Sequence, residues 1–421
     1  MPNRLIEPNT SFISTIHKVS YETDLMSNNI PLYSIQDKNQ AVCGVEIIFG
    51  NGKSDEQANG AAYFSTTLLK SGTKGYDANQ INNFFELRGA FVQLQSNLDF
   101  STLSLYCLSD KLKEVFPFFL NLFNQPAFPK DKLEALKNKK KQELTINEQK
   151  SDFWASKLFK ETLFKDHPYG NVLNQQDIKS ITPEILSNHW HNDSLNAVKF
   201  ITVAGHFDKH LLISKIESSL KTQTAKLAEH TTNLTFTNTA QSITKTLEGN
   251  KQSSLKAGCL TINQSDVNYP ALSLGNTLYG GYFGSRLMQS VREDKGLTYG
   301  INSSIQHLHQ ASFLQISADV KMGFAKDVLT LIQIELDKLI TKNIPESELA
   351  KVKNYLIGEY KSNSETTFDK INKVKLLKLK KLDDLYFINH FQSIIKLTSS
   401  DVQEALTKYY KSILFSTVTV E

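Results

Sequence analysis

An internal repeat of predicted elements constrains the fold of this chain more than any other feature of its sequence. In the first half, alternating apolar and polar residues predict strands over residues 92–95 and 103–107, and a helix is expected from about Asp110. A second helix is expected from Pro129, because proline is favoured in the first turn of a helix. The first half therefore contains one unit of two strands followed by two helices.

The second half repeats this order. Gly296 precedes alternating strands that extend to residues 314–318, a helix follows, and Pro345 opens another helix. The first helix of each unit carries apolar residues at helical spacing, namely Leu112, Val115, Phe116, Phe119 and Phe123 in the first half and Leu329, Ile332, Leu336 and Leu339 in the second. Two copies of one unit are hard to explain by chance, so we expect two homologous domains.

The order of the elements predicts the fold class. Strands come in meanders that precede the helices, whereas a parallel α/β sheet needs strict alternation, so we expect an α+β fold of two antiparallel sheets covered by helices. Thr, Asn, Gln and Ser dominate residues 221–245, and apolar periodicity fades there, as is typical of a linker. We predict a first domain over residues 1–225, a linker over 226–245 and a second domain over 246–421.

Composition and cysteine content limit the function classes. The net charge of +4 is too small, and the basic residues are too dispersed, to favour nucleic acid as a partner. No apolar run approaches the length of a membrane span, and the first residues lack the apolar core of a signal peptide. Cys43, Cys107 and Cys259 are an odd number with apolar neighbours, which indicates buried thiols in a reducing compartment. We therefore expect a cytoplasmic protein.

The densest local pattern lies over residues 280–300. It contains three glycines that permit a tight backbone, Gly280, Gly281 and Gly284. Ser285 is the expected N-cap of a short helix, and Gly296 is expected to end that helix in the left-handed conformation.

The residues after this helix bring an arginine and a tyrosine together. A strand over residues 297–305 returns Tyr299 toward the helix end that carries Arg292. The whole block resembles the second homologous domain of the pitrilysin (insulinase-like) zinc metallopeptidases, the inverzincins, and the resemblance covers nearly the whole chain. It implies that Arg292 and Tyr299 contact bound peptide, and that the two domains face each other as half of a clamshell. From the residues alone, Arg292 is also explained as a cation favoured by the helix dipole, and Tyr299 as a packed strand residue.

The resemblance makes the first half the test for catalysis, because inverzincins carry the zinc motif His-x-x-Glu-His in their first domain. Residues 59–62 and 69–73 match the family's flanks of this motif. Between them, Tyr63 replaces the first His, Thr66 the Glu and Thr67 the second His. Since zinc sites use Cys, His or carboxylate ligands rather than neutral hydroxyl groups, we expect this segment to be an ordinary buried helical turn.

The family's third zinc ligand is a Glu, and Glu143 and Glu148 lie near the place where it would fall. One carboxylate without the two imidazoles does not hold zinc. We therefore expect no metal, no cofactor and no catalytic residue on this chain alone, and we expect zinc on a partner.

Some family members divide the site between two chains, and this chain resembles the subunit of bacterial and mitochondrial processing peptidases that carries the Arg/Tyr pair. The resemblance implies a non-catalytic, peptide-binding subunit that completes the chamber of a homologous zinc-bearing partner. Arg292 and Tyr299 would bind the substrate carbonyl or the oxyanion, and the strand edge over residues 90–95 would pair with extended peptide. Two alternatives stay open: a silent scaffold, like the core subunits of the mitochondrial cytochrome bc complex, and a lone peptide-binding module.

Three other features have weaker functional interpretations. The pairs His189/His191 and His307/His309 have a spacing that would place two imidazoles on one face of a strand, as in some metal sites, but neither has a Cys or carboxylate at ligand spacing. The lysine-rich residues 370–381 are a candidate surface for an acidic partner or a membrane, although a solvated helix face explains them as well.

Overall fold

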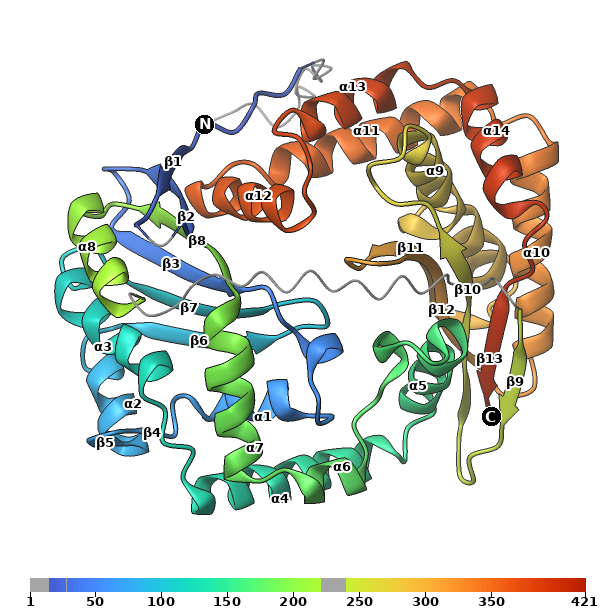
Figure 1. Cartoon of the computed structure of the whole chain (residues 1–421). Helices are drawn as coiled ribbons and strands as arrows, with labels where there is room; N and C mark the ends of the chain where they lie inside the picture. Colours follow the sequence, from blue (N-terminus) through green and yellow to red (C-terminus); the bar gives the residue numbers. More distant parts are fainter. Residues whose placement is uncertain (1–14, 28, 221–239) are drawn as a thin grey trace, which may run out of the picture.

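The computed structural model describes residues 15–27, 29–220 and 240–421. Two sheets form the framework, one in each half of the chain, and they lie on opposite sides of the molecule with helices around and between them (Figure 1). All strands of the first sheet lie between Glu22 and Gly205, and all strands of the second between Ser242 and Val420. The division of the chain into two sheet-bearing halves therefore agrees with the repeat seen in the sequence.

The elements of the first half are β1 (Glu22–Leu25), β2 (Pro31–Gln36), β3 (Val42–Phe49), η1 (Lys53–Asp55), α1 (Ala61–Leu68), β4 (Gly72–Thr73), β5 (Tyr76–Asp77), α2 (Ala78–Glu86), β6 (Phe91–Ser96), β7 (Ser101–Leu108), α3 (Leu112–Asn124), α4 (Lys130–Asn147), α5 (Ser151–Phe164), η2 (Pro168–Gly170), α6 (Gln175–Ser180), α7 (Pro183–Asn188), η3 (His189–Ser194), η4 (Leu195–Ala197), β8 (Val198–Gly205) and α8 (Lys209–Ser219).

The elements of the second half are β9 (Ser242–Lys245), β10 (Gln252–Thr261), α9 (Tyr269–Asn276), η5 (Thr277–Gly281), η6 (Met288–Asp294), β11 (Thr298–His307), β12 (Ser312–Lys321), α10 (Ala325–Thr341), α11 (Glu346–Ser362), α12 (Thr367–Leu379), α13 (Tyr386–Lys396), α14 (Ser399–Tyr410) and β13 (Ser416–Val420). The segments η3, η5 and η6 are π-helical.

The two sheets are built alike. The first has the strand order β1-β2-β8-β3-β7-β6 and the second β11-β12-β10-β13-β9, so that β3 and β10 have antiparallel neighbours on both sides. Each sheet also contains one parallel pair, β2 with β8 and β13 with β9. The α+β fold of two homologous, largely antiparallel sheets is confirmed. Strand patterning alone does not reveal the parallel pairs, because their members lie far apart in the sequence.

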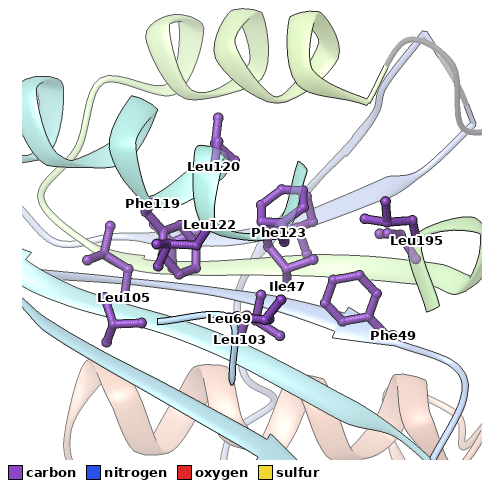
Figure 2. Packing of buried hydrophobic residues seen from close by; sticks show 14 of the residues in the cluster. Ile47, Phe49, Leu69, Leu103, Leu105, Phe119, Leu120, Leu122, Phe123 and Leu195 are labelled. Carbon is purple, nitrogen blue, oxygen red and sulfur yellow. The ribbon is translucent and has the colours of Figure 1, made fainter. Parts of the chain in front are cut away.

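The helices of the predicted repeat are present in both halves. The predicted apolar residues of α3 and α10 pack into the two cores, and α4 and α11 begin directly after Pro129 and Pro345. Figure 2 shows the first core, where Ile47 and Leu103 from the sheet meet Phe119 and Phe123 from α3. Burying each such side chain contributes about 1.5–3 kcal/mol, so each half has a core sufficient for a domain.

The three cysteines lie in these cores, as predicted. Cys43 and Cys107 are directly opposite on β3 and β7, and Cys259 lies on β10. All three are free thiols, and burial raises the pKa of Cys107 to about 11 and that of Cys259 to about 12. Thiols with such pKa values remain protonated and unreactive at neutral pH.

One helix of each half packs on the sheet of the other half. Helix α5 lies on β10 and β13, and α12 lies on β2 and β8, in each case on the sheet face opposite the core. A glycine on the central strand makes room for an aromatic ring: a Cβ added to Gly44 would lie 2.9 Å from Phe368 of α12, and one added to Gly258 would lie 3.0 Å from Phe159 of α5. This exchange of helices joins the two halves.

The predicted linker is described only at its end. Residues 226–239 lie outside the described residues. Ser242–Lys245, which the prediction placed in the linker, form β9 and pair with β13, so these residues belong to the second sheet. Among the residues that the structure describes, no helix is both long enough and apolar enough to cross a membrane.

Candidate functional site

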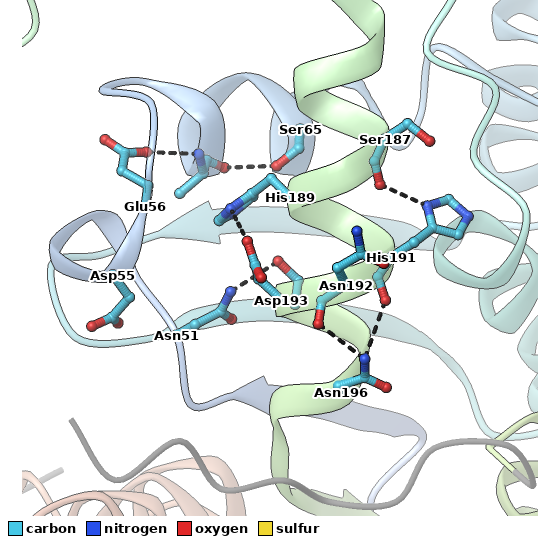
Figure 3. Close-up of polar contacts among 12 residues, drawn as sticks. Asn51, Asp55, Glu56, Ser65, Ser187, His189, His191, Asn192, Asp193 and Asn196 are labelled. Carbon is cyan, nitrogen blue, oxygen red and sulfur yellow. Dashed lines mark hydrogen bonds and ion pairs between the residues drawn. The ribbon is translucent and has the colours of Figure 1, made fainter.

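Helix α1 takes the place that the family resemblance gives to the zinc helix. The preceding Gly60 has a φ of 100°, a left-handed conformation that favours glycine. The Glu56 carboxylate accepts the N–H groups of Gly60 and Ala62, each at 2.7 Å. Figure 3 shows the Glu56 side chain beside the start of this helix. Burial raises the pKa of Glu56 to about 7, against the two N–H groups and Lys53, which lower it. A carboxylate thus closes the N-terminus of α1, where the helix dipole favours negative charge.

The three positions of the replaced motif differ in exposure. Thr66 is buried, whereas Tyr63 and Thr67 are partly exposed. Lys140 of α4 places its ammonium 4.8 Å from the centroid of the Tyr63 ring and 3.1 Å from the Glu143 carboxylate. Burial raises the pKa of Tyr63. The positive charge of Lys140 lowers this pKa, and the negative charge of Glu143 raises it. Glu143 therefore lies close to the degenerate motif in space.

These side chains do not fit zinc. Glu148, the other candidate, contributes its backbone carbonyl, which accepts the Trp154 indole N–H at 2.8 Å. The groups around Tyr63 are hydroxyls, one carboxylate and an ammonium, whereas zinc sites use Cys, His or carboxylate ligands. No group of three or more His, Cys, Asp or Glu side chains that would suit a metal occurs in residues 15–27, 29–220 and 240–421. The ammonium of Lys140 would also repel a cation at this place.

A buried polar cluster beside α1 was not predicted from the sequence (Figure 3). His189 Nδ1 lies 3.4 Å from the Asp193 carboxylate, and burial lowers the pKa of His189 against the opposing effect of Asp193. Asn51 Nδ2 donates to the Ser194 hydroxyl at 3.0 Å. The first contact lies within η3, and the second joins η3 to the loop before α1. The spacing of four residues between His189 and Asp193 is the only sequence signal for this cluster.

The glycine-rich block packs closely on β11. A Cβ added to Gly280 would lie 2.6 Å from the Ser303 Cβ, so this close approach requires glycine. Asn276 Nδ2 donates to the Ser303 carbonyl at 3.2 Å, and the Ser303 hydroxyl donates to Asn276 Oδ1 at 2.5 Å. These contacts fix η5 beside the strand that carries Tyr299.

The short helix after the glycines differs from the prediction at its start. Ser285 is buried and its hydroxyl has no hydrogen-bond partner within the described residues, so it does not cap the helix. Its backbone carbonyl instead accepts the Gln289 N–H at 2.9 Å. Gly296 ends the helix as predicted, with a φ of 61° and its N–H donating to the Arg292 carbonyl at 3.0 Å.

Arg292 lies on η6 with its guanidinium over an exposed aromatic ring. The guanidinium carbon is 4.8 Å from the centroid of Phe283, whose side chain is 72% exposed. The Arg292 side chain is 33% exposed, with the Glu293 carboxylate 3.7 Å away, and it donates no hydrogen bond to the part of the chain that the structure describes. Its N–H donors are therefore available to a ligand.

Tyr299 lies in a β-bulge of the edge strand β11. The register with β12 shifts between Thr298 and Ile301, so Tyr299 and Gly300 stand out from the regular pairing. Tyr299 is 88% exposed, which rules out the interpretation as a packed strand residue. A bulge bends its strand and redirects a side chain, and bulges are frequent beside active sites. No hydrogen bond joins Tyr299 to Arg292 within the described residues.

An open groove of about 530 Å³ lies between the glycine-rich block and β11. Tyr282 and Phe283 line one side, and Gly300, Asn302 and Ser304 line the other. The ring under Arg292 and the bulge residue next to Tyr299 thus both border one groove.

Strand β6 forms an edge of the first sheet. It pairs with β7 in unbroken register from Phe91 to Ser96, and its other side has no strand neighbour among the described residues. The predicted pairing segment, residues 90–95, therefore does lie on a sheet edge. Helix α1 packs beside this strand.

The two histidine pairs do not form the arrangement considered from their spacing. His189 and His191 lie on the π-helical segment η3 rather than on a strand. His307 is the last residue of β11, with Nδ1 2.8 Å from the Ser312 hydroxyl, and His309 lies in the turn that follows. The spacing would place two imidazoles on one face only if both residues lay on a strand, and in the structure the first pair lies on a helix and the second continues past the end of β11.

Most lysines of residues 370–381 bind within the protein. Four ammonium groups have internal partners: Lys373 with the Tyr360 carbonyl at 3.2 Å, Lys375 with Glu46 at 2.6 Å, Lys378 with Asp384 at 2.8 Å and Lys380 with the His307 carbonyl at 2.6 Å. The ion pair of Lys375 with Glu46 of β3 joins α12 to the first sheet, and the other three contacts join this segment to α11, to Asp384 and to β11. The segment is therefore not a free basic face for a membrane or an acidic partner.

Comparisons with known proteins agree with this architecture. Residues 32–177 match the family described as Insulinase (Peptidase family M16), and residues 200–356 match the Peptidase M16 inactive domain. The chain is 23% identical over 385 residues to an uncharacterized zinc protease, YmxG, of Bacillus subtilis, with 89% of this chain and 92% of that protein covered. It is 22% identical over 338 residues to the non-peptidase homolog YmxG of Helicobacter pylori, with 77% and 75% covered.

A solved structure gives the same fold. The crystal structure of the peptidase M16 inactive domain from Pseudomonas fluorescens superposes with a TM-score of 0.85 at 24% identity, covering 95% of this chain and 98% of that chain. Both domain types occur here in order along one chain, and the first has lost the residues of its zinc motif. The resemblance read from the glycine-rich block is thereby confirmed, and the chain belongs to the M16 (insulinase) peptidase family as a member of the inactive type.

Proposed function

We propose that this chain is the non-catalytic, peptide-binding subunit of a two-chain zinc metallopeptidase whose homologous partner carries the zinc. The observation that supports this most directly is the state of Arg292 and Tyr299, an available guanidinium and an exposed phenol beside one open groove. Both are hydrogen-bond donors that suit a peptide carbonyl or an oxyanion. The replaced motif on α1 explains why the chain needs a partner for catalysis.

The partner's zinc and its Glu would activate water against the peptide bond. This chain supplies the opposite wall of the shared chamber. Phe283 positions the Arg292 guanidinium through a cation–π contact of about 0.5–1 kcal/mol, which leaves its N–H groups free for the substrate. The bulge of β11 projects Tyr299 from the same region. An extended peptide pairs by strand addition with the edge of β6.

A scaffold role is the main alternative. A scaffold needs its arginines and tyrosines for packing or for internal pairs, yet Tyr299 is exposed, and the one ion-pair partner of Arg292 among the described residues is the exposed Glu293. A lone peptide-binding module would use the same two residues without a partner. The Helicobacter pylori relative is named a non-peptidase homolog, which agrees with a chain that does not cleave by itself.

Reconstitution with a zinc-bearing M16 protein from the same genome tests the proposal. Sedimentation velocity should show a one-to-one complex at micromolar concentration. A structure of that complex should show an interface that buries roughly 2,000 Å² or more in total. Peptide hydrolysis should appear only in the mixture and should be abolished by a chelator. Absence of a complex together with peptide binding by this chain alone would favour the lone module, and absence of both would favour the scaffold.

A further inference from the structure

Two hairpin turns, one from each half, meet where both edge strands end. The turn between β6 and β7 carries Asp99, and the turn between β11 and β12 carries His309 and Gln310. The Asp99 carboxylate accepts the His309 N–H at 2.7 Å. The edge strand that is proposed to pair with peptide and the strand that carries Tyr299 are therefore joined at these turns.

Tyr169 of η2 connects the same two turns. Its phenol donates to the Asp99 carboxylate and accepts the Gln310 N–H at 3.2 Å. Tyr169 is 1% exposed, and burial together with the bond to Asp99 raises its pKa, so the phenol keeps its proton and donates. Buried His167 accepts the Tyr169 N–H at Nδ1, and its Nε2 lies 3.1 Å from Gln310 Oε1. One buried network thus joins the two halves.

The exchanged helices α5 and α12 end at this junction as well. Lys165 follows α5 with a φ of 40°, and Lys381 lies directly after the end of α12 with a φ of 53°. Such left-handed conformations cost free energy outside glycine and persist where the surrounding contacts fix the backbone. Lys380 donates to the His307 carbonyl at the end of β11 at 2.6 Å, and it lines one cavity of about 60 Å³ together with Asp99.

The length of β11 makes this junction important for the proposed site. Tyr299 is the second residue of the strand and His307 is the last, so about 25 Å separate them at roughly 3.3 Å per residue. A rotation of the second half by about 5° about the junction would therefore move Tyr299 by roughly 2 Å. A misplacement of about 1 Å can lower an enzymatic rate about 10²-fold.

We propose that Asp99 is a positioning residue that fixes the angle between the edge strand β6 and the strand that carries Tyr299. This inference rests on the proposed function and adds the contact that aligns the two parts of its peptide-binding site. The packing of α5 and α12 holds the halves together, but packed helices can slide by small amounts. The hydrogen bonds of Asp99 are directional, and its charge makes them about twice as strong as neutral ones, so they select one angle.

A distance between the halves tests this role without any assay of function. Nitroxide labels on the variant with Leu25→Cys and Val267→Cys, two exposed positions in different halves, report that distance by double electron–electron resonance. The native thiols are buried, so they do not react with the label. The chain with Asp99 should give one narrow distance distribution. Asp99→Ala should shift or broaden this distribution by roughly 2 Å.

Turnover in the reconstituted complex tests the consequence for the site. Asp99→Ala should lower kcat about tenfold or more and change KM less than about twofold, because the misplaced donors act mainly on the transition state. Asp99→Asn keeps an oxygen that accepts the His309 N–H, so it should restore most of the turnover and the narrow distribution. Tyr169→Phe removes one hydroxyl donor and should lower kcat about threefold.

Tyr106→Phe is the matched control. The Tyr106 phenol donates to the Glu46 carboxylate at 2.9 Å, the same kind of bond as that of Tyr169, but both residues lie in the first sheet. This variant should leave the distance distribution and the turnover unchanged. Circular dichroism verifies the folding of each variant. If Asp99→Ala does not fold, Tyr169→Phe replaces it in both measurements.

The outcomes separate this inference from the proposed function. An unchanged distance distribution in the folded variants of Asp99 and Tyr169 would overturn the positioning role. A shifted distribution with full turnover would overturn the claim that the angle matters for the site. If the unmodified chain and its partner hydrolyse no peptide, the proposed function fails, and the distance measurement still decides whether Asp99 fixes the angle.

Discussion

The edge strands β6 and β11 occupy equivalent places in the two halves, and they differ in the feature that matters for function. Each follows a glycine in the left-handed conformation, Gly89 with a φ of 60° and Gly296 with a φ of 61°. β6 pairs with its neighbour in unbroken register, whereas β11 contains a bulge that exposes Tyr299. The repeated unit thus has a regular edge strand in the first half and a bulged edge strand in the second.

The difference shows how a duplicated unit loses one function without losing its fold. In the first half, Thr66 of the replaced motif is buried and Tyr63 carries Lys140 over its ring, so these residues contribute to packing. In the second half, Tyr299 is exposed and lies outside the core, and Glu293, the ion-pair partner of Arg292 within the described residues, is exposed as well. Exposed aromatic and cationic groups beside a groove are better explained by a ligand than by stability.

Metal content gives the largest contrast between the halves. The purified chain is expected to hold far less than one zinc per chain and to hydrolyse no peptide alone, because the hydroxyls of Tyr63, Thr66 and Thr67 do not replace two imidazoles and a carboxylate. Elemental analysis and a peptidase assay with and without chelator measure this. A content of about one zinc per chain, together with hydrolysis that a chelator abolishes, would show that the first half is catalytic. It would contradict the proposed difference between the two halves.

Substitution of the Arg/Tyr pair should give the next largest effect. In the reconstituted complex, Arg292→Ala and Tyr299→Phe each remove a proposed donor to the oxyanion, and each should lower turnover roughly 10²- to 10³-fold, or about 2.7–4 kcal/mol. Melting temperature, assembly and the partner's zinc content should remain unchanged, because neither side chain packs in a core.

The first half supplies a matched control for this pair. Arg88 follows α2 with its guanidinium carbon 3.9 Å from the Phe84 centroid, much as Arg292 lies over Phe283, but Arg88 also pairs with Glu114 at 2.6 Å. Arg88→Ala should therefore leave turnover unchanged. Full activity of the Arg292→Ala/Tyr299→Phe double variant would eliminate the composite site.

The sequence predicted a large part of this structure, and the failures have physical causes. The repeat, the fold class and the buried cysteines follow from local periodicity, which the two halves display separately. Periodicity shows that a helix face is buried but not which sheet buries it, so the exchange that places Phe159 on Gly258 and Phe368 on Gly44 was not predicted. The bulge at Tyr299 depends on pairing with β12, which local pattern does not specify.

Alanine substitution of Gly44 or Gly258, the glycines beside Phe368 and Phe159, should give the third largest effect, a loss of stability. Gly44→Ala would place its Cβ 2.9 Å from the rings of Phe368 and Tyr106, which are side chains that can shift. Gly258→Ala would place its Cβ 2.0 Å from the backbone oxygen of Leu314, which is fixed in β12. We expect a loss of about 3 kcal/mol or more in the free energy of unfolding for Gly258→Ala and about 1 kcal/mol for Gly44→Ala. Urea unfolding followed by circular dichroism measures both, and a larger loss for Gly44→Ala would contradict the account of the two contacts.

The smallest expected effect concerns two buried histidines, one in each half. His189 has the Asp193 carboxylate at 3.4 Å, which opposes the lowering of its pKa by burial. His390 in α13 is 7% exposed, its Nδ1 has no hydrogen-bond partner within the described residues, and burial, with a smaller effect of His307, lowers its pKa to about 4. We therefore expect the stability of the second half, which contains His390, to be more sensitive to acid than that of the first half, which contains His189.

The sign and size of this effect follow from proton linkage. The pKa of a histidine in the unfolded chain is about 6.5, so between pH 6.5 and 4 the unfolded state binds more protons at His390, and stability falls as the pH is lowered. At pH 5.5 the loss relative to pH 8 is about 1.4 kcal/mol for one such residue. His390→Phe keeps an aromatic ring among Tyr269, Tyr360 and Tyr386 and should remove this part of the loss, whereas His191→Gln at the surface should leave it. Urea unfolding at both pH values supplies the measurement, and an equal acid loss in the unmodified chain and His390→Phe would show that the buried imidazole of the second half is not its source.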